Sequence, residues 1–377
     1  MTRRLTIITE IIAPYRIPVF NALARESGID LRVIFLSRTD GSLRQWRVYD
    51  DEIRFSYEVL PSWRKRIGRY NLLLNQNLAD SLRNAAPDVI ICGGYSYLAS
   101  WQAMMWAARN RVQFLLWSES TGRDRRSHHV VVESLKKVFF RNCAAFVVPG
   151  KSALDYLQQM GVPRKSIFIA RNAVDVGRFS ELGRKARADA VRARRELVLP
   201  DRYFLFVGRL VREKGVLSLL EAYGELPQEL RERIGLVFAG DGPLRGELEA
   251  LARDIYPGNV HFPGFVDRDE LAPYYSLAEC IVLPTYTDTW GLVVNEAMAC
   301  GLPVICTHVA GCAAELVQSN GRLVEPGSVT ELRQAMMEIG MDPTLRDGMA
   351  AQSEAMIALF SPEAWASGIV EAAQAVG

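Results

Sequence analysis

The sequence predicts an α/β protein made of two Rossmann-like, doubly wound domains that face each other across a cleft. Three observations support this fold class. The chain has 377 residues, short apolar runs alternate with amphipathic stretches in both halves, and polar or glycine-rich turns follow those runs. The length favours two domains over one, and the alternation is typical of parallel sheets covered by helices.

The first strand is expected from Leu5 to about Ile12, where Pro14 ends the apolar run. A basic pair before an apolar run is also typical of a signal peptide, but Glu10 interrupts the run and no small-residue cleavage site follows. No window reaches the roughly 18 apolar residues of a membrane span, so the sequence predicts a cytoplasmic protein. Four further strands are expected in the first half, at residues 31–36, 88–92, 113–117 and 144–148.

The second half repeats the pattern. Strands are expected at 203–207, 234–238, 281–283 and 303–306, and a helix at 217–223. The segment 181–196 has no sustained apolar face and predicts an exposed helix or a flexible connector. Ser361 and Pro362 predict the start of a last helix. The expected domains are therefore 1–171 and 172–361, with a final helix at 362–377.

Charge is divided unevenly along the chain. Residues 1–195 contain 33 Lys and Arg against 17 Asp and Glu, whereas residues 196–377 contain 12 against 26. A basic half favours an anionic partner, such as lipid headgroups, a phosphorylated acceptor or nucleic acid. An ordinary solvated basic surface is the alternative.

The six cysteines are scattered without a Cys-x-x-Cys pair, and several lie in apolar runs. This predicts free, buried thiols in a reducing compartment. The four histidines are not spaced with cysteines as zinc ligands are, so no metal site is expected.

Two carboxylates, Asp288 and Glu296, are separated by seven residues in a segment that predicts strand, polar loop and helix. The loop would bring unpaired backbone N–H groups and Asp288 to the rim of a sheet. Glu296 would lie about one turn inside the helix. Amides for an anion and carboxylates for hydroxyl groups suit an anionic, hydroxyl-rich ligand.

Two turns upstream follow predicted strands. The first begins at Gly208 and contains the cations Arg209 and Lys214, which suit a phosphate. The second is the Gly-Asp-Gly-Pro turn at 240–243, at the sheet edge where ligands gather in open α/β folds. Neither turn is a Walker loop or a Gly-x-Gly-x-x-Gly motif, which argues against a dinucleotide dehydrogenase.

Several segments occur in a characteristic order between residues 200 and 330: VGRLVREKG, GDGP, HFPGFV, PTYTDTWGLVVNEAMACGLPVI, AGCAAELV and NGRLVEPG. This order resembles the family 4 retaining glycosyltransferases of the GT-B architecture. FSPEAW at the end resembles the helix with which that family crosses back onto its first domain. APYRIPVF at 13–20 is similar to the Pro-Tyr-Arg opening of one branch.

The resemblance implies a nucleotide-sugar donor site in the second domain. Arg209 and Lys214 would neutralise the diphosphate in place of a metal ion, because charge builds on the leaving phosphate. Glu296 would accept hydrogen bonds from the ribose, and Asp288 would contact hydroxyls of the donor sugar. The other donor-side residues implied are Gly208, Gly240, Trp290, Gly291 and Leu292.

The chain departs from the family pattern at two places. Asp288 stands where the family usually has Glu, which withdraws the carboxylate by one methylene, roughly 1.5 Å. Glu119 stands where many members have a histidine that faces the donor sugar, and it is the one candidate for a covalent nucleophile. On the acceptor side, the implied residues are Tyr15, Arg16 and His128.

The sequence thus predicts a retaining glycosyltransferase without a cofactor, with front-face attack on a nucleotide-diphosphate sugar. Its acceptor would be a saccharide, a lipid-linked sugar or a small molecule, and not nucleic acid. The mixture of aromatic and basic residues at 63–70 fits contact with an anionic membrane, or equally a solvated loop near the acceptor. The alternatives are a nucleotide-sugar epimerase, a sugar phosphorylase or a non-catalytic protein that binds anionic surfaces.

Overall fold

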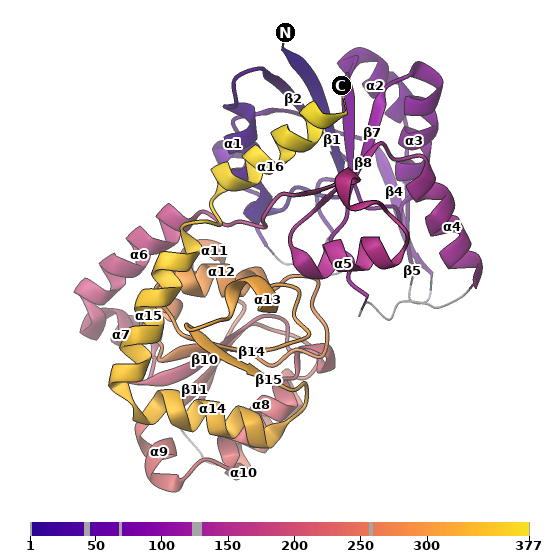
Figure 1. Cartoon of the computed structure of the whole chain (residues 1–377). Helices are drawn as coiled ribbons and strands as arrows, with labels where there is room; N and C mark the ends of the chain where they lie inside the picture. Colours follow the sequence, from indigo (N-terminus) through magenta and orange to yellow (C-terminus); the bar gives the residue numbers. More distant parts are fainter. Residues whose placement is uncertain (1, 41–45, 68–69, 123–129, 256–258, 377) are drawn as a thin grey trace. The chain divides into compact units, whose positions relative to one another are not determined.

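The computed structural model describes residues 2–40, 46–67, 70–122, 130–255 and 259–376 (Figure 1). The chain forms two compact units, the first made of Met1–Ala173 with Pro362–Gly377 and the second of Val174–Ser361. The first unit has 26 Lys and Arg against 16 Asp and Glu, and the second has 19 against 27. The basic residues between 174 and 195 therefore belong to the acidic unit, so the charge break in the sequence does not mark the boundary between units.

The first unit is built on a seven-stranded sheet in which all neighbours pair in parallel, in the order β3-β2-β1-β6-β7-β8-β9. Apolar side chains alternate between the two faces of each central strand, so both faces are buried. The strands are β1 (Arg3–Thr9), β2 (Ile29–Phe35), β3 (Ser56–Val59), β6 (Val89–Gly93), β7 (Gln113–Trp117), β8 (Ala145–Val148) and β9 (Ile167–Ile169).

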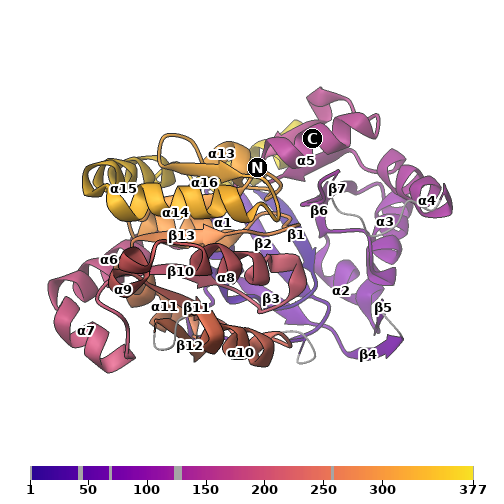
Figure 2. The same cartoon turned by 90° about the horizontal axis from the view of Figure 1, so that it is seen from below.

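Helices cover both faces of this sheet (Figures 1 and 2). Helices α1 (Ile17–Ala24) and α16 (Pro362–Ala375) pack together on one face around the fully buried Trp365. The other face is covered by α2 (Leu78–Ala85), α3 (Leu98–Asn110), α4 (Val130–Arg141) and α5 (Lys151–Gln159).

One sequence expectation in this unit is wrong. The first strand ends at Thr9 rather than near Ile12, because the chain turns at Glu10 before the 3-10 turn Pro14–Arg16. The sequence left two interpretations of the basic and aromatic segment near residue 63, membrane contact or a solvated loop. In the structure it forms β4 (Ser62–Ile67), which pairs antiparallel with β5 (Tyr70–Asn75) in a separate two-stranded sheet.

The second unit is built on a six-stranded parallel sheet in the order β12-β11-β10-β13-β14-β15. Its four central strands are the apolar runs that the sequence predicts, each within one residue. The strands are β10 (Tyr203–Val207), β11 (Gly235–Ala239), β12 (Val260–Gly264), β13 (Cys280–Leu283), β14 (Val304–Thr307) and β15 (Gly321–Val324).

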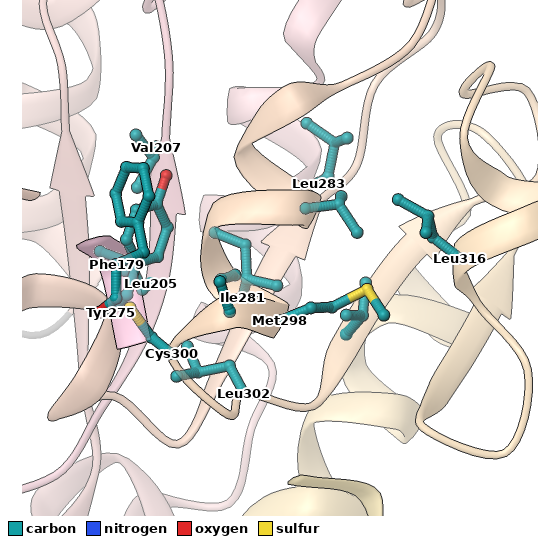
Figure 3. Packing of buried hydrophobic residues seen from close by; sticks show 14 of the residues in the cluster. Phe179, Leu205, Val207, Tyr275, Ile281, Leu283, Met298, Cys300, Leu302 and Leu316 are labelled. Atoms are coloured by element: carbon teal, nitrogen blue, oxygen red, sulfur yellow. Dashed lines mark hydrogen bonds between the residues drawn. The ribbon is translucent and has the colours of Figure 1, made fainter. Parts of the chain in front are cut away.

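Helices again bury both faces of the sheet. Figure 3 shows part of one core, in which Phe179 lies beside Tyr275 and Met298 reaches toward Leu316. This face is covered by α6 (Val176–Ala188), α11 (Arg268–Ser276), α12 (Leu292–Ala299), α13 (Ala313–Leu316) and the end of α15 (Pro343–Ile357). The other face is covered by α8 (Val216–Gly224), α9 (Gln228–Arg233), α10 (Arg245–Ile255) and α14 (Val329–Met341).

The segment expected to be an exposed helix or a connector is two helices. Helix α6 packs against α11 and α12 through Phe179, and α7 (Ala190–Leu197) has no buried residue. All six cysteines are free and all but Cys143 are buried, as the sequence predicts. Among the described helices, none is both long and apolar enough to cross a membrane.

Candidate functional site

Two glycine turns lie against each other at the carboxyl edge of the second sheet. Gly208 follows β10 and donates to Ala239 O (3.0 Å), and Leu210 donates to Asp241 O (2.9 Å). A Cβ atom on Gly240 would lie 1.9 Å from Gly208 O, and φ of Gly240 is +155°. Glycine is therefore required here by the approach of one turn to the other.

The cationic turn that follows is fixed to the end of β13. Glu213 O accepts hydrogen bonds from Thr285 Oγ1 and from the Tyr286 amide, both at 2.9 Å. Gly215 has φ of +68°, and a Cβ atom there would lie 2.0 Å from Pro284 O. These contacts position Lys214 next to the loop that contains Asp288.

Lys214 and Asp288 form an ion pair. Lys214 Nζ lies 2.5 Å from Asp288 Oδ2, and the side chains are 23% and 15% exposed. The other carboxylate oxygen, Oδ1, accepts from the Trp290 amide at 3.3 Å. The structure thus joins two residues that are far apart in the sequence, and it leaves two of the three ammonium N–H groups for other partners.

The loop from Asp288 to Trp290 is held by the segment after β14. Gly311 donates to Asp288 O and Cys312 donates to Trp290 O, both at 3.0 Å. The indole of Trp290 is buried and donates from Nε1 to Asn295 Oδ1 at 2.8 Å. Trp290 is therefore a core residue whose own amide donates to Asp288.

Helix α12 begins directly after this loop. Gly291 caps it with φ of +98°. Within the described chain, the amides of Gly291, Leu292 and Val293 donate to no protein acceptor. They are the orphan donors of a helix N-terminus, which attract anions.

Arg209 lies on the turn after β10 and is exposed, and it pairs with no side chain in the described part of the molecule. Its guanidinium is therefore available to an anionic ligand. The edge of the second sheet combines this free cation, the Lys214–Asp288 pair and the first amides of α12.

Glu296 lies one turn inside α12 and is almost completely buried. Its Oε2 accepts from the Tyr275 hydroxyl at 2.6 Å. Burial raises the pKa of Glu296 to about 7, although the bond from Tyr275 and the charge of Arg268 oppose the rise. The carboxyl group can therefore gain or lose a proton near neutral pH.

In the first unit, Glu119 follows β7 and forms an ion pair with Arg16. Arg16 also donates to Asn172 Oδ1 (3.0 Å), and its guanidinium carbon lies 4.3 Å from the ring centroid of Trp117. The structure thus brings together Arg16 and Glu119, which the sequence places in different roles. The ion pair and the stacking fix both side chains at the carboxyl edge of the first sheet.

Tyr15 lies next to this pair. Its ring packs edge-on against Trp46, with centroids 5.7 Å apart, and Arg16 lies 5.3 Å from the Tyr15 centroid. His128, the third predicted acceptor residue, lies outside the described residues.

Sequence reasoning missed Tyr275, the direct partner of Glu296, and Gly311, which holds the Asp288 loop. No spacing links Tyr275 to Glu296, because their contact depends on the packing of α11 against α12. Gly311 lies in the segment AGCAAELV, but only the close approach to Thr289 shows why glycine stands there. No cluster of three metal-ligating side chains occurs among the residues that the structure describes.

The two halves of the chain match two family models. Residues 20–178 match "Glycosyltransferase Family 4", and residues 189–356 match "Glycosyl transferases group 1". The first match covers most of the first unit, and the second covers most of the second unit. The Lys214–Asp288 pair and Glu296 lie within the second match.

Individual relatives cover only part of the chain. O-antigen chain mannosyltransferase B of Escherichia coli is 29% identical over 43% of this chain and 42% of its own length. The putative teichuronic acid biosynthesis glycosyltransferase TuaC of Bacillus subtilis is 32% identical over 43% and 39%. The chain thus spans less than half the length of these two relatives.

Several solved structures match nearly the whole chain. HepE of Anabaena, solved in complex with UDP, has a TM-score of 0.75 at 16% identity, covering 98% of this chain and 99% of its own. Sucrose-phosphate synthase of Thermosynechococcus elongatus has a TM-score of 0.73 at 22% identity, covering 98% of both chains. These matches and the two parallel sheets confirm the predicted GT-B fold.

Proposed function

We propose that this chain is a retaining glycosyltransferase that moves a sugar from a nucleotide-diphosphate sugar to an acceptor hydroxyl. The observation that carries the proposal is the Lys214–Asp288 ion pair beside the exposed Arg209 and the free amides of α12. The named relatives support it, because they are described as transferases and not as epimerases or phosphorylases.

The cations act on the leaving group. As the bond from the anomeric carbon to the β-phosphate oxygen breaks, negative charge builds on the diphosphate. Arg209 and the two remaining N–H groups of Lys214 would stabilise this charge, aided by the amides of Gly291 and Leu292. Asp288 holds Lys214 in place and has lone pairs left for a hydroxyl of the donor sugar.

The acceptor oxygen would attack the anomeric carbon from the face that the diphosphate leaves, so the configuration is retained. The acceptor proton would pass to the departing β-phosphate oxygen. The ion pair with Arg16 disfavours Glu119 as a covalent nucleophile, because it stabilises the carboxylate that would have to attack.

Fixed cations would replace a metal ion in this reaction. Lys214 and Arg209 supply positive charge at the edge where the diphosphate is proposed to bind. Turnover should therefore continue in excess EDTA. Complete loss of turnover that magnesium restores would contradict this part of the proposal.

We assign the acceptor to the first unit, where Tyr15 and Arg16 lie at the carboxyl edge of the sheet. The names of these two relatives refer to O-antigen chains and to teichuronic acid biosynthesis, which favours a saccharide or lipid-linked saccharide acceptor. We extend the proposal to peripheral contact of the basic first unit with an anionic membrane.

The test begins with a panel of nucleotide sugars in a thermal-shift assay, since a donor that binds the folded protein raises its apparent stability. Transfer from the donor that binds is then followed by NMR, which reports the anomeric configuration of the product. Lys214→Ala should lower turnover by roughly 100-fold or more. Arg212→Ala, which removes an exposed cation from the same turn, is the matched control. Equal turnover of the two variants would refute the role of Lys214.

A further inference from the structure

The β4–β5 hairpin of the first unit has one face turned inward. Leu73 is 2% exposed and packs in the core of the first unit. Arg64 pairs with Asp40 and Glu10, and Asn75 Nδ2 donates to Leu36 O at 2.5 Å. These contacts fix the orientation of the hairpin, so its opposite face must point away from the unit.

The opposite face is apolar and exposed. Trp63 pairs with Leu74 and Lys65 pairs with Leu72, and side chains alternate along a strand, so these four residues share one face. Trp63 is 53% exposed, Leu72 39% and Leu74 37%, and Lys65 is exposed as well. We call this set of four side chains the outer hairpin face.

An outward-facing strand pair in contact with water normally carries polar side chains. Here three large apolar residues lie together, and a contiguous exposed apolar patch is typical of an interaction surface. The hairpin is not part of the seven-stranded sheet, so these side chains are not needed to complete that sheet.

Charge indicates what this face contacts. Its one ionisable side chain is the exposed Lys65, residues 62–75 contain no acidic residue, and the first unit as a whole has 26 Lys and Arg against 16 Asp and Glu. A tryptophan beside leucines and basic side chains matches the composition of a membrane interface, where the ring lies at the level of the headgroups and the cations meet anionic lipids.

We infer that the outer hairpin face docks on an anionic lipid bilayer, with Trp63, Leu72 and Leu74 entering the headgroup region and Lys65 on the lipid phosphates. This deepens the membrane contact of the proposed function by naming the surface that makes it. Helix α4 would reinforce the contact. On α4, Leu135 and Val138 are 50% and 47% exposed, and Figures 1 and 2 both show α4 and the hairpin on the same side of this unit.

The experiment is sedimentation of the full chain with vesicles of phosphatidylcholine containing about one third phosphatidylglycerol. Trp63→Ser is expected to weaken partitioning about tenfold or more, because it removes the largest apolar side chain of the face. Lys65→Gln should weaken it about fivefold and reduce its salt dependence. The matched control is Val191→Ser on α7, where the side chain is 82% exposed in the acidic unit.

Equal partitioning of the Trp63→Ser and Val191→Ser variants would overturn the inference. The inference would also fail if the wild-type chain does not bind the vesicles but forms a dimer that the Trp63→Ser substitution disrupts. The outer hairpin face would then bind a second copy of the chain. Nucleoside diphosphate affinity, measured by calorimetry in each variant, is expected to stay unchanged. A wild-type chain that binds a nucleoside diphosphate but not the vesicles would contradict this inference alone. A wild-type chain that binds the vesicles but no nucleoside diphosphate would contradict the proposed function alone.

Discussion

Glu296→Gln removes a titrating group from the interior of the second unit with little change in shape. Burial raises the pKa of Glu296 to about 7, from 4.5 in an exposed glutamate. One unit of pKa difference corresponds to about 1.4 kcal/mol, so the shift represents about 3 kcal/mol. Glutamine keeps an oxygen that can accept from Tyr275.

Proton linkage determines the direction in which the free energy of unfolding changes with pH. Because the folded state holds this proton more tightly than the unfolded state, the contribution of Glu296 to stability is fully present below pH 4.5. It is lost as the pH rises through about 7. The free energy of unfolding of the wild type should therefore fall by up to about 3 kcal/mol relative to the Gln variant across this window.

Urea unfolding of both proteins at intervals from about pH 5 to pH 8 measures this difference, since other titrating groups contribute equally and cancel. Tyr275→Phe is a useful companion variant. The hydroxyl of Tyr275 lowers the pKa of Glu296, so its removal should move the transition to higher pH. Parallel curves for wild type and Glu296→Gln at all pH values would refute the reasoning.

Three further predictions concern the same site. Nucleoside diphosphate affinity, measured by calorimetry, should rise with pH through 7 in the wild type, since ribose hydroxyls donate best to the ionised carboxylate. In Glu296→Gln the affinity should not change with pH. A wild-type affinity independent of pH would contradict this prediction. Asp288→Asn should lower turnover about tenfold or more while nucleotide affinity changes little, because Lys214 loses the negative charge that positions it. Unchanged steady-state turnover would contradict the positioning role of Asp288. Gly311→Ala should destabilise the protein to urea by about 2 kcal/mol or more, because the new Cβ would lie 1.9 Å from Thr289 O. The control is Gly246→Ala, where no atom lies within 4 Å, and equal stability of the two variants would disprove the steric argument.

The architecture was predictable where the signal was a buried apolar run. The predicted strand at 203–207 has the same bounds as β10, and the predicted strand at 281–283 differs from β13 by one residue. Such strands are buried on both faces, so their sequence is apolar throughout and their limits are sharp. The hairpin β4–β5 was missed because its inward face holds Arg64 and its outward face holds Trp63, which reverses the usual pattern of a half-exposed strand.

The site was predictable as a set of residues but not as a set of contacts. The order of the segments indicated Lys214, Asp288 and Glu296. It could not indicate that Lys214 binds Asp288 directly, because that contact depends on the anchoring of the cationic turn to Thr285 and Pro284. The side chain of Trp290 likewise belongs to the core, which only its hydrogen bond to Asn295 reveals.

Helix α16 has a consequence for the order in which the protein can fold during synthesis. The first unit buries Trp365 in its core, and Gly368 approaches Ile169 O so closely that a Cβ atom would lie 2.3 Å away. The ribosome must therefore make the entire second unit before the first can be completed. At about 5–20 residues per second this takes roughly 10–40 s. Throughout that interval the site for α16 beside α1 stays open, and the apolar side chains that line it remain accessible to chaperones or to aggregation.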